Sequence, residues 1–515
     1  MREPCALGID LGTSAAKAAL YGISGRLLGA ASTPITTLRS PGGHAEQNPG
    51  QVWQAVASAI TTVVRAAPVS PEDILAVGCC GQYSSIVPVN AEGRAAANMV
   101  LWMDNRGGDH TLAIHERHPE AFETFLAHHG IPPLDSGNDS LAHILHLTLD
   151  RPDLARRTRV FLEPVDYVNL RLTGRAAATQ CTMFMSLLCD NRTLSATGYD
   201  PELVSMAGVD ERMLPELLPI DATVGTVLPD VADWLGLSRA TAVIAGGNDT
   251  QAACLATRAG EHGRGGLCVG TTSVVVDQVD FKHTDIDNQV LSMPGLLPGS
   301  YAVMAENGIG GRALDHLLGS LLLARDALGD HHVEQPWGSV DALVGDVPAG
   351  SDGLLFLPWL NGSLAPDGNP AMRGGFLNLK LDTTRAHLVR AAMEGVAYNL
   401  RRLLPAVEAF AGRRYESLVM SGGAARSDAW TRILADVLER PIRRVAEPTH
   451  ANCRAMAALA LERLGRSGAD GALATPDTSG VVEPDPAAGR VYAPLFEQFQ
   501  SSFERTRPVF EALNG

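Results

Sequence analysis

A carboxylate directly before a glycine-bearing turn lies at the start of the chain, in Gly8-Ile9-Asp10-Leu11-Gly12-Thr13-Ser14. Alternating apolar residues on both sides of the turn predict a β-hairpin. Gly12 allows close backbone approach, and the amides and hydroxyls of Thr13 and Ser14 can hold phosphate oxygens. Asp10 is placed to hold a hydrated Mg²⁺, which needs only one or two carboxylates. For this stretch alone, a polar hairpin turn without function is an equally simple interpretation.

A second turn of the same kind lies in the middle of the chain. The apolar run Gly266 to Val269 leads into Gly270-Thr271-Thr272-Ser273, and Val274-Val275-Val276 follows. The repetition predicts two related halves, each of which presents a phosphate-binding hairpin to a shared site.

A candidate general base precedes this second hairpin. Thr241 to Ala245 predicts a strand that ends in Gly246-Gly247-Asn248-Asp249, and Thr250 to Thr257 predicts the helix after it. A carboxylate at the end of a strand can take a proton from a hydroxyl group in phosphoryl transfer. Asp249 could equally be the N-cap of the helix, or serve in both ways.

A glycine-rich turn lies near the end of the chain. Ser417 to Met420 predicts a strand, Ser421-Gly422-Gly423-Ala424-Ala425-Arg426-Ser427 a turn, and Asp428 to Leu438 an amphipathic helix. Paired glycines at a strand–helix junction let a flat ring or a phosphate approach the helix N-terminus. A tight turn without a ligand is the common alternative.

The lysines exclude one large class of nucleotide-binding protein. The chain has only Lys17, Lys282 and Lys380, and none of them follows a glycine. The Gly-Lys-Ser/Thr phosphate loop is therefore absent, which excludes an ordinary Walker-type NTPase.

Composition limits the remaining possibilities. The 515 residues predict two or more domains, and 45% apolar with 19% charged residues is typical of a globular protein. A formal charge of −16 argues against nucleic acid or an anionic membrane as partner. No run reaches the roughly 20 apolar residues of a membrane span, and the start lacks the apolar core of a signal peptide, which predicts a cytoplasmic protein. Eight scattered cysteines without a Cys-x-x-Cys pair predict reduced thiols.

The order of predicted elements is that of an α/β layer fold. After the opening hairpin come a strand at 27–33, a helix at 49–65 and strands at 74–79 and 85–89. From about Asp109 to Leu235 the pattern is mainly helical, with His143 and His146 three residues apart. Without an HExxH pattern, we expect these histidines to be solvated or packed and not to bind a metal.

These motifs together resemble the FGGY family of carbohydrate kinases, within the sugar kinase/heat-shock/actin superfamily. The resemblance covers about the whole chain, in order and separation. It rests on Gly8 to Ser14, Gly247-Asn248-Asp249, Gly270 to Ser273, Phe356 to Gly362 with its continuation to Gly374 and Met393 to Tyr398, and Ser421 to Ser427.

The resemblance implies an α/β fold with two ribonuclease-H-like, actin-like ATPase domains that flank a central cleft. The implied first domain, residues 1–244, binds the sugar and carries the helical insertion at about 109–235. The implied second domain, residues 245–515, binds ATP.

The resemblance also implies roles for particular residues. Asp249 resembles the catalytic base, and Asp10 together with Asp249 is expected to hold Mg²⁺. The residues expected to contact ATP are Gly12, Thr13, Ser14, Lys17, Gly270, Thr271, Thr272, Gly310, Gly422, Gly423, Ala424 and Ser427.

Sugar contacts are expected from two stretches that follow strands of the first domain, and from Asn248. The candidates are Gln82, Tyr83, Ser84, Trp102, Asp104 and Arg106. Trp102 offers an apolar face to the C–H surface of a sugar, and Asp104 and Arg106 can bind hydroxyls. A packed tryptophan and a structural Asp–Arg pair are the alternatives.

The substrate motifs depart from those of the most similar members. Xylulokinases usually have Gln-Met-His-Gly where this chain has Gln82-Tyr83-Ser84-Ser85, so their sugar-contacting histidine is missing. They also have Trp-Asn-Asp at Trp102-Met103-Asp104, and Gly-Gly-Gly-Asp-Asn at Gly246 to Thr250. The resemblance favours phosphorylation of a ketopentose such as xylulose, and it leaves open gluconate, another ketose or a polyol. A homodimer is also left open.

Two other functions are compatible with parts of the sequence. Gly308-Ile309-Gly310-Gly311-Arg312-Ala313 matches the dinucleotide pattern G-x-G-x-x-A, as in an NAD-dependent oxidoreductase. A non-catalytic actin-like ATPase would share the phosphate turns, but it would need neither Asp249 nor the cluster from Trp102 to Arg106.

Overall fold

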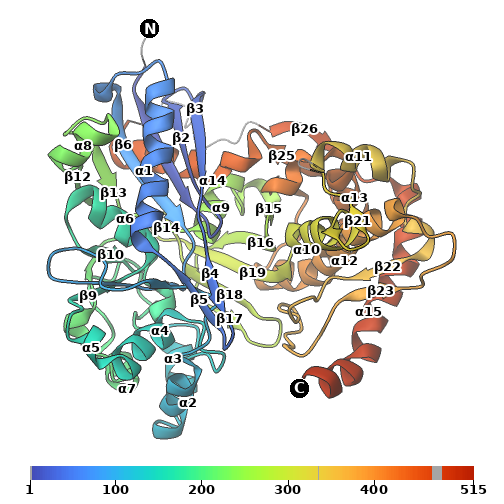
Figure 1. Cartoon of the computed structure of the whole chain (residues 1–515), viewed down its shortest axis with the longest axis horizontal. Helices are drawn as coiled ribbons and strands as arrows, with labels where there is room; N and C mark the ends of the chain where they lie inside the picture. The colour runs from blue at the N-terminus through green and yellow to red at the C-terminus, as the bar shows by residue number, and fades with distance from the viewer. Residues whose placement is uncertain (1–2, 334–335, 467–477) are drawn as a thin grey trace.

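Two large mixed β-sheets, one from each half of the sequence, form the framework of the chain (Figure 1). The computed structural model describes residues 3–333, 336–466 and 478–515. Residues 1 and 2, part of the start of the chain considered for a signal peptide, lie outside these ranges. No helix in the described ranges is both long and apolar enough to cross a membrane.

The first sheet has seven strands and contains the first phosphate turn. Across the sheet they are β12 (Thr223–Thr226), β13 (Ala242–Ile244), β6 (Ile74–Gly81), β1 (Cys5–Leu11), β2 (Ala15–Gly22) and β3 (Leu27–Pro34), with β14 (Gly247–Asn248) also paired to β6. The predicted hairpin is formed by β1 and β2, which are antiparallel, whereas β1 and β6 are parallel. The two strands of this hairpin are almost wholly buried, as their apolar sequence predicts.

The second sheet repeats this order around the second turn. Its eight strands are β17 (Thr284–Asp285), β18 (Val290–Pro294), β19 (Tyr301–Ile309), β16 (Thr272–Val279), β15 (Arg264–Val269), β24 (Ser417–Ser421), β25 (Ile442–Val445) and β26 (Thr478–Val482). Here β15 and β16 form the hairpin, and β24 lies parallel to β15 as β6 does to β1. The predicted internal repetition is therefore confirmed at the level of strand order.

Two helices, α14 (Ala451–Arg463) and α9 (Asp249–Thr257), lie between the two sheets (Figure 1). The helix α14 packs on β1 and β6, and α9 packs on β15 and β16 and against α14. A Cβ at Gly8 would lie 1.8 Å from the carbonyl oxygen of Cys453 in α14, so only glycine permits this contact. The backbone of α14 thereby fixes the strand that ends at Asp10.

The predicted domain boundary at 244/245 lies just before the region where the two halves of the chain pack together through α9 and α14. The strand β14, directly after it, still pairs with β6 of the first sheet, and α14 returns to that sheet late in the chain. The outer face of the first sheet is covered by α1 (Pro49–Ala66), which packs on β2 and β3.

The segment predicted as a helical insertion contains short strands as well as helices. Its helices are α2 (Gly108–Arg117), α3 (Ala121–His128), α4 (Ser140–Leu145), α5 (Pro152–Ala155), α6 (Pro164–Thr173), α7 (Pro201–Ala207) and α8 (Pro229–Leu235). Its strands β9 (Val160–Leu162), β10 (Ala177–Thr179) and β11 (Glu216–Leu218) lie outside the main sheets, whereas β12 extends the first sheet.

The strand predicted at 85–89 is shorter than expected. Only Val87–Val89 forms β7, and it pairs with β9 and not with the main sheet. Ser84 has a left-handed backbone, with φ of +57°, and the amide of Ser85 donates to Glu163 over 3.2 Å. The chain therefore turns before it can extend, and Tyr83 to Ser85 become a loop.

The remaining elements complete the second half. The helices are α10 (Gly311–His316), α11 (Trp337–Gly345), α12 (Arg385–Phe410), α13 (Asp428–Leu438) and α15 (Pro486–Asn514). Its short strands are β20 (Arg325–Asp326), β21 (Gly329–Asp330), β22 (Leu355–Leu357) and β23 (Gly375–Leu377). In the first half, β4 (Leu38–Ser40), β5 (His44–Gln47) and β8 (Met99–Val100) form a separate small sheet. The packing of α12 against α13 builds the largest apolar core of this half, which includes Trp359 and Tyr398.

Candidate active site

Asp10 and Lys17 face each other across the first hairpin. They are opposite each other in the β1–β2 register, and the ammonium nitrogen of Lys17 lies 3.0 Å from a carboxylate oxygen of Asp10. The Asp10 carboxylate raises the pKa of Lys17, against the opposing effect of burial. The amide of Gly12 donates to the carbonyl of Ala15 over 3.0 Å and closes the turn, which leaves Thr13 half-buried and Ser14 exposed.

The first turn is tied to the predicted sugar-binding stretches by a hydrogen-bond network. The hydroxyl of Thr13 donates to Gln82 over 2.9 Å and accepts from the indole nitrogen of Trp102 over 3.1 Å. The amide nitrogen of Gln82 donates to Gln47 over 3.0 Å, and Gln47 donates to the carbonyl of Thr13 over 2.7 Å. Gln47 was not among the predicted site residues, because its position before α1 carries no functional motif.

The second turn is one residue shorter than the first and has a second support. The amide of Gly270 donates to the carbonyl of Thr272 over 2.9 Å, and a Cβ at Gly270 would meet no atom within 4 Å. The amides of Gly310 and Gly311 donate to Thr271 and Gly270 over 3.0 and 2.7 Å. The loop that matched the dinucleotide pattern therefore supports the phosphate turn.

The oxidoreductase interpretation is not supported by this topology. The strand before the glycine-rich loop, β19, runs antiparallel to both β16 and β18. A dinucleotide fingerprint needs a parallel βαβ unit, because the helix must return the chain to a parallel neighbour.

The third glycine-rich turn has one open and one constrained glycine. Gly422 has a φ of +89°, and a Cβ there would lie 2.5 Å from the carbonyl oxygen of Val269. Gly423 is exposed, and a Cβ there would meet nothing within 4 Å, whereas Ala424 is buried. The hydroxyl of Ser427 accepts from the amide of Trp430 over 3.0 Å, so it caps α13.

Asp249 is the first residue of α9, directly after the first sheet ends. Burial raises the pKa of Asp249 to about 7, and the nearby carboxylates of Asp10 and Glu306 add to the shift. The residue as a whole is half-buried. A base with a pKa close to neutrality is well matched to proton transfer from an alcohol.

The N-cap of α9 is Asn248 and not Asp249. The side-chain oxygen of Asn248 accepts from the backbone amide of Gln251 over 2.7 Å, and the backbone amide of Asn248 donates to the side-chain oxygen of Gln251 over 2.8 Å. This capping box occupies the buried Asn248 side chain and leaves the carboxylate of Asp249 free of that role. A direct sugar contact by Asn248 stays a prediction.

Asp104 and Arg106 form an internal ion pair. Asp104 is fully buried and accepts from the amide of Ala45 over 2.9 Å and from the Arg106 guanidinium over 2.6 Å. Burial acts to raise the pKa of Asp104, but the bonds from Arg106 and Ala45 outweigh it and hold the pKa below its usual range. Arg106 also pairs with Glu46 at 2.7 Å. The internal Asp104–Arg106 ion pair considered from the sequence is therefore present. A sugar contact by either residue stays a prediction.

Tyr83 and Ser84 face different surroundings. The hydroxyl of Tyr83 donates to the sulfur of Met304 in β19 over 2.9 Å, which joins the first-domain loop to the second sheet. The buried hydroxyl of Ser84 donates to the carbonyl of Asn138 over 2.7 Å and is committed to the insertion. Of the two, only Tyr83 remains half-exposed.

Glu306 is a second acidic residue near Asp249 that the sequence analysis missed. It lies in β19, and burial raises its pKa to about 7. Its charge contributes to the raised pKa of both Asp249 and Tyr83. No motif marks Glu306, which stands between Ala305 and Asn307 in β19.

The residues present fit a magnesium ion bound with a nucleotide. The described residues contain no group of three or more His, Cys, Asp or Glu side chains able to hold a metal by themselves. Mg²⁺ keeps several waters and uses one or two carboxylates together with phosphate oxygens, which Asp10 and Asp249 can supply. The open turns at Gly270 and Gly423 leave room for phosphate and base.

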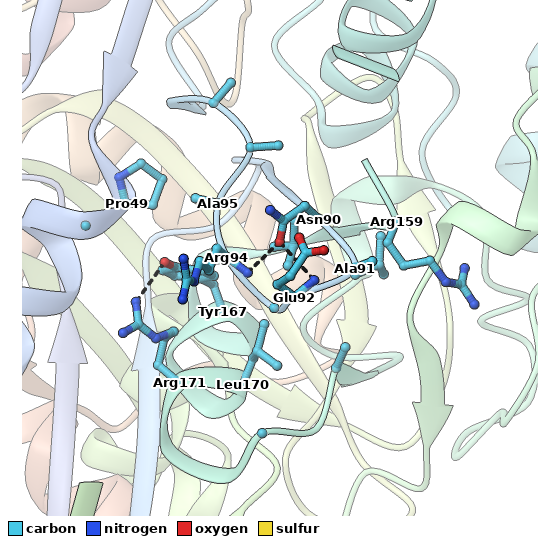
Figure 2. Close-up of a pocket in the computed structure, with 18 of the residues that line it drawn as sticks. Pro49, Asn90, Ala91, Glu92, Arg94, Ala95, Arg159, Tyr167, Leu170 and Arg171 are labelled. Carbon is cyan, nitrogen blue, oxygen red and sulfur yellow. Dashed lines mark hydrogen bonds between the residues drawn. The ribbon is translucent and has the colours of Figure 1, made fainter. Parts of the chain in front are cut away.

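A cavity elsewhere on the first domain is separate from these residues. It has a volume of about 980 Å³ and lies on the outer side of the domain, where Asn90, Arg94 and Tyr167 contribute to its wall (Figure 2). The guanidinium of Arg171 in this wall lies 5.0 Å from the ring centroid of Trp53 and donates to Tyr167 over 3.2 Å. None of the predicted site residues lines this cavity.

The known proteins similar to this chain are named as kinases of different substrates. The xylulose kinase of Bacillus subtilis (strain 168) is 28% identical over 435 residues, which cover 84% of this chain and 83% of that protein. The glycerol kinase of Thermus brockianus is 30% identical over 463 residues, which cover 85% of this chain and 86% of that protein. The crystal structure of gluconate kinase from Lactobacillus acidophilus superposes with a TM-score of 0.83 at 21% identity and covers 99% of both chains.

The match to family models spans both halves of the chain. The model for the N-terminal domain of the FGGY family of carbohydrate kinases matches residues 5–256, and the model for the C-terminal domain matches residues 265–462. The fold is accordingly the two-domain, actin-like ATPase fold of sugar kinases. Both family models describe carbohydrate kinases and not non-catalytic ATPases. The chain belongs to the FGGY family of carbohydrate kinases, phosphotransferases that use an alcohol group as acceptor.

Proposed function

We propose that this carbohydrate kinase transfers the γ-phosphate of ATP to a hydroxyl of a ketopentose such as xylulose, with Asp249 as the general base. One observation carries the proposal: the half-buried Asp249 has a pKa raised to about 7, and the charge of Asp10, in the first phosphate turn, contributes to that shift. The base and the nucleotide-binding carboxylate therefore come from adjoining parts of one site.

The transfer is an in-line displacement at the γ-phosphorus. The substrate hydroxyl oxygen bonds to phosphorus, the bond to the oxygen of the departing ADP breaks, and the hydroxyl proton passes to Asp249. The amides of the two turns and the ammonium of Lys17 orient the phosphates and offset their charge. Mg²⁺, held by Asp10 with Asp249, would neutralise the phosphate oxygens when bound.

The connection between Thr13, Gln82 and Trp102 supports a coupled role for the two predicted subsites. Because one hydroxyl bonds to both side chains, movement of the phosphate turn also moves the predicted sugar-binding residues. A closed, water-excluding arrangement limits the transfer of phosphate to water in the absence of sugar.

The ketopentose is favoured by the similarity to a xylulose kinase along 84% of the chain. The test is a coupled assay of ADP release with a panel of pentuloses, hexuloses, polyols and aldonates. We expect ADP release that depends on a neutral ketose, with xylulose among the best substrates. If no compound on the panel raises ATP turnover above the sugar-free rate, the proposal is wrong.

A further inference from the structure

Glu306 faces the same space as Tyr83 and Asp249. Along β19, exposure alternates: Met304 and Glu306 are partly exposed, and Ala305 between them is buried. Successive side chains of a strand point to opposite faces, so Glu306 lies on the face of Met304, whose sulfur receives the Tyr83 hydroxyl. This face of β19 meets the first-domain loop that carries the predicted sugar contacts.

The register of the second sheet places Glu306 beside the second phosphate turn. Glu306 is opposite Val274 in the β16–β19 pair, and β16 begins at Thr272 of that turn. Opposite residues of an antiparallel pair share a face, so Val274 and Glu306 line the same side. Glu306 therefore lies opposite a residue that is two positions beyond Thr272 of the turn, with an irregularity in the register between them.

The carboxylate of Glu306 is unpaired within the described residues. It takes part in no hydrogen bond or ion pair there, and burial raises its pKa although part of the residue stays exposed. A polar group withdrawn from water without a partner is costly, unless a ligand supplies one. Hydroxyl groups of a sugar are suitable donors, and such bonds would favour the charged form of Glu306.

The charges around this position are unfavourable for a second anion. Asp10, Asp249 and Glu306 bring three carboxyl groups into one region, and Lys17 is already bonded to Asp10. Arg106 is engaged by Asp104 and Glu46. A sugar acid would bring its carboxylate against Glu306 with no free basic partner among these residues.

We infer that Glu306 is a specificity-determining residue, which accepts hydrogen bonds from hydroxyls of a neutral ketose or polyol and excludes aldonates such as gluconate. The inference rests on the proposed function and deepens it, because it selects among the substrates left open by the family. Glu306 acts on which sugar binds, whereas Asp249 acts on the proton of the reacting hydroxyl.

The test compares Glu306→Gln and Glu306→Asp with the wild-type protein on xylulose, a polyol and gluconate. In Glu306→Gln, kcat/KM for the neutral substrate is expected to fall about tenfold or more, mainly through KM, because a charge-assisted bond is lost. The kcat/KM for gluconate is expected to rise, so that the neutral-to-acid ratio falls more than tenfold, while the KM for ATP is unchanged. Glu306→Asp keeps the charge and is expected to retain most of the discrimination.

A matched control removes the same charge from a distant surface. Glu497 is exposed on α15, and Glu497→Gln is expected to leave both substrate preferences and the melting temperature unchanged. Calorimetric titration of each protein with xylulose and with gluconate measures the same preference without turnover. The inference is overturned if Glu306→Gln leaves the neutral-to-acid ratio unchanged, or if the wild-type protein prefers gluconate. Absence of turnover with every sugar would instead refute the kinase proposal, and the titrations would still decide the role of Glu306.

Discussion

The indole nitrogen of Trp102 donates a hydrogen bond of 3.1 Å to the hydroxyl of Thr13, which joins a predicted sugar-binding residue to a predicted phosphate-binding turn. The two residues lie 89 positions apart in the chain, and no local motif connects them. Because the same hydroxyl donates to Gln82, the turn is held from two sides. The phosphate turn and the predicted sugar-binding residues therefore form one connected unit.

Breaking the Trp102–Thr13 bond is expected to impair both substrates. Trp102→Phe keeps an aromatic ring and removes the donor, so about 1 kcal/mol of positioning energy is lost. We expect kcat/KM for sugar to fall roughly fivefold to tenfold and the KM for ATP to rise in parallel.

A double-mutant cycle with Thr13→Val separates this coupling from lost packing. The two changes together are expected to cost less than the sum of the single changes, and Thr13→Ser, which keeps the hydroxyl, should stay close to wild type. Additive effects would show that the hydrogen bond does not couple the two subsites.

Asp249→Asn is expected to abolish phosphate transfer and leave nucleotide binding largely intact. The amide cannot take the proton of the attacking hydroxyl, so kcat is expected to fall roughly 10²- to 10⁴-fold. Removal of the carboxylate also relieves its repulsion with Asp10. ADP binding, measured by calorimetry, is expected to remain within about threefold of wild type. An unchanged kcat would exclude Asp249 as the base.

The turns could be predicted from the sequence because each is a local signal. A Gly-Thr-Ser segment between two apolar runs contains both the hairpin and its chemistry, and the β1–β2 and β15–β16 hairpins form as expected. The strand order of the two sheets follows from repetition of that signal. Local patterns are sufficient here because the residues concerned are adjacent in the chain.

The predictions that depend on tertiary packing were less complete. The i, i+2 spacing of Asp104 and Arg106 fits both a sugar site and an internal pair, and only the position of Ala45 in β5 shows where the carboxylate is bound. Glu306 has no local signal at all, since its neighbourhood arises from the register of β19 and from the approach of Tyr83. The N-cap of α9 is Asn248, one residue before the Asp249 considered for that role, because the exact start of a helix is not fixed by local sequence.

Removal of divalent metal is expected to abolish transfer, and Asp10 is expected to set the metal requirement. Chelation with EDTA should reduce ADP release to background, with recovery on addition of excess Mg²⁺. In Asp10→Asn the Mg²⁺ concentration for half-maximal rate is expected to rise at least about tenfold, and the maximal rate to fall, because a neutral amide is a weaker ligand. Asp10→Asn with an unaltered Mg²⁺ dependence would remove Asp10 from the metal site.

Lys17 offers a companion test, because it is bonded to Asp10. Lys17→Met removes the positive charge, so we expect a higher KM for ATP and a lower kcat. Lys17→Arg retains the charge and should recover part of the loss. An equal loss in both variants would indicate that the length of the side chain, and not its charge, is required.

His143 is expected to make stability depend on pH between about 4 and 6.5. The imidazole is fully buried in α4, and neither ring nitrogen makes a hydrogen bond of good geometry among the described residues, although the backbone of Ser84 is near enough to favour the charged form. Burial lowers the pKa of His143 to about 4, against the opposing influence of Asp104. The unfolded chain therefore binds this proton at pH values where the folded protein does not, and stability falls as the pH drops below the unfolded pKa.

The effect of His143 can be isolated by substitution. Between pH 7 and pH 4.5 this residue is expected to account for about 2 to 3 kcal/mol of lost stability. His143→Leu, which places an apolar side chain in the same buried position, should unfold at a similar or higher temperature at pH 7 and lose less on acidification. His129, whose burial lowers its pKa to about 3, acts in the same direction and remains in the variant. Thermal unfolding at pH 4.5, 5.5 and 7 measures the difference, and parallel pH profiles for the two proteins would show that His143 is not the group that titrates.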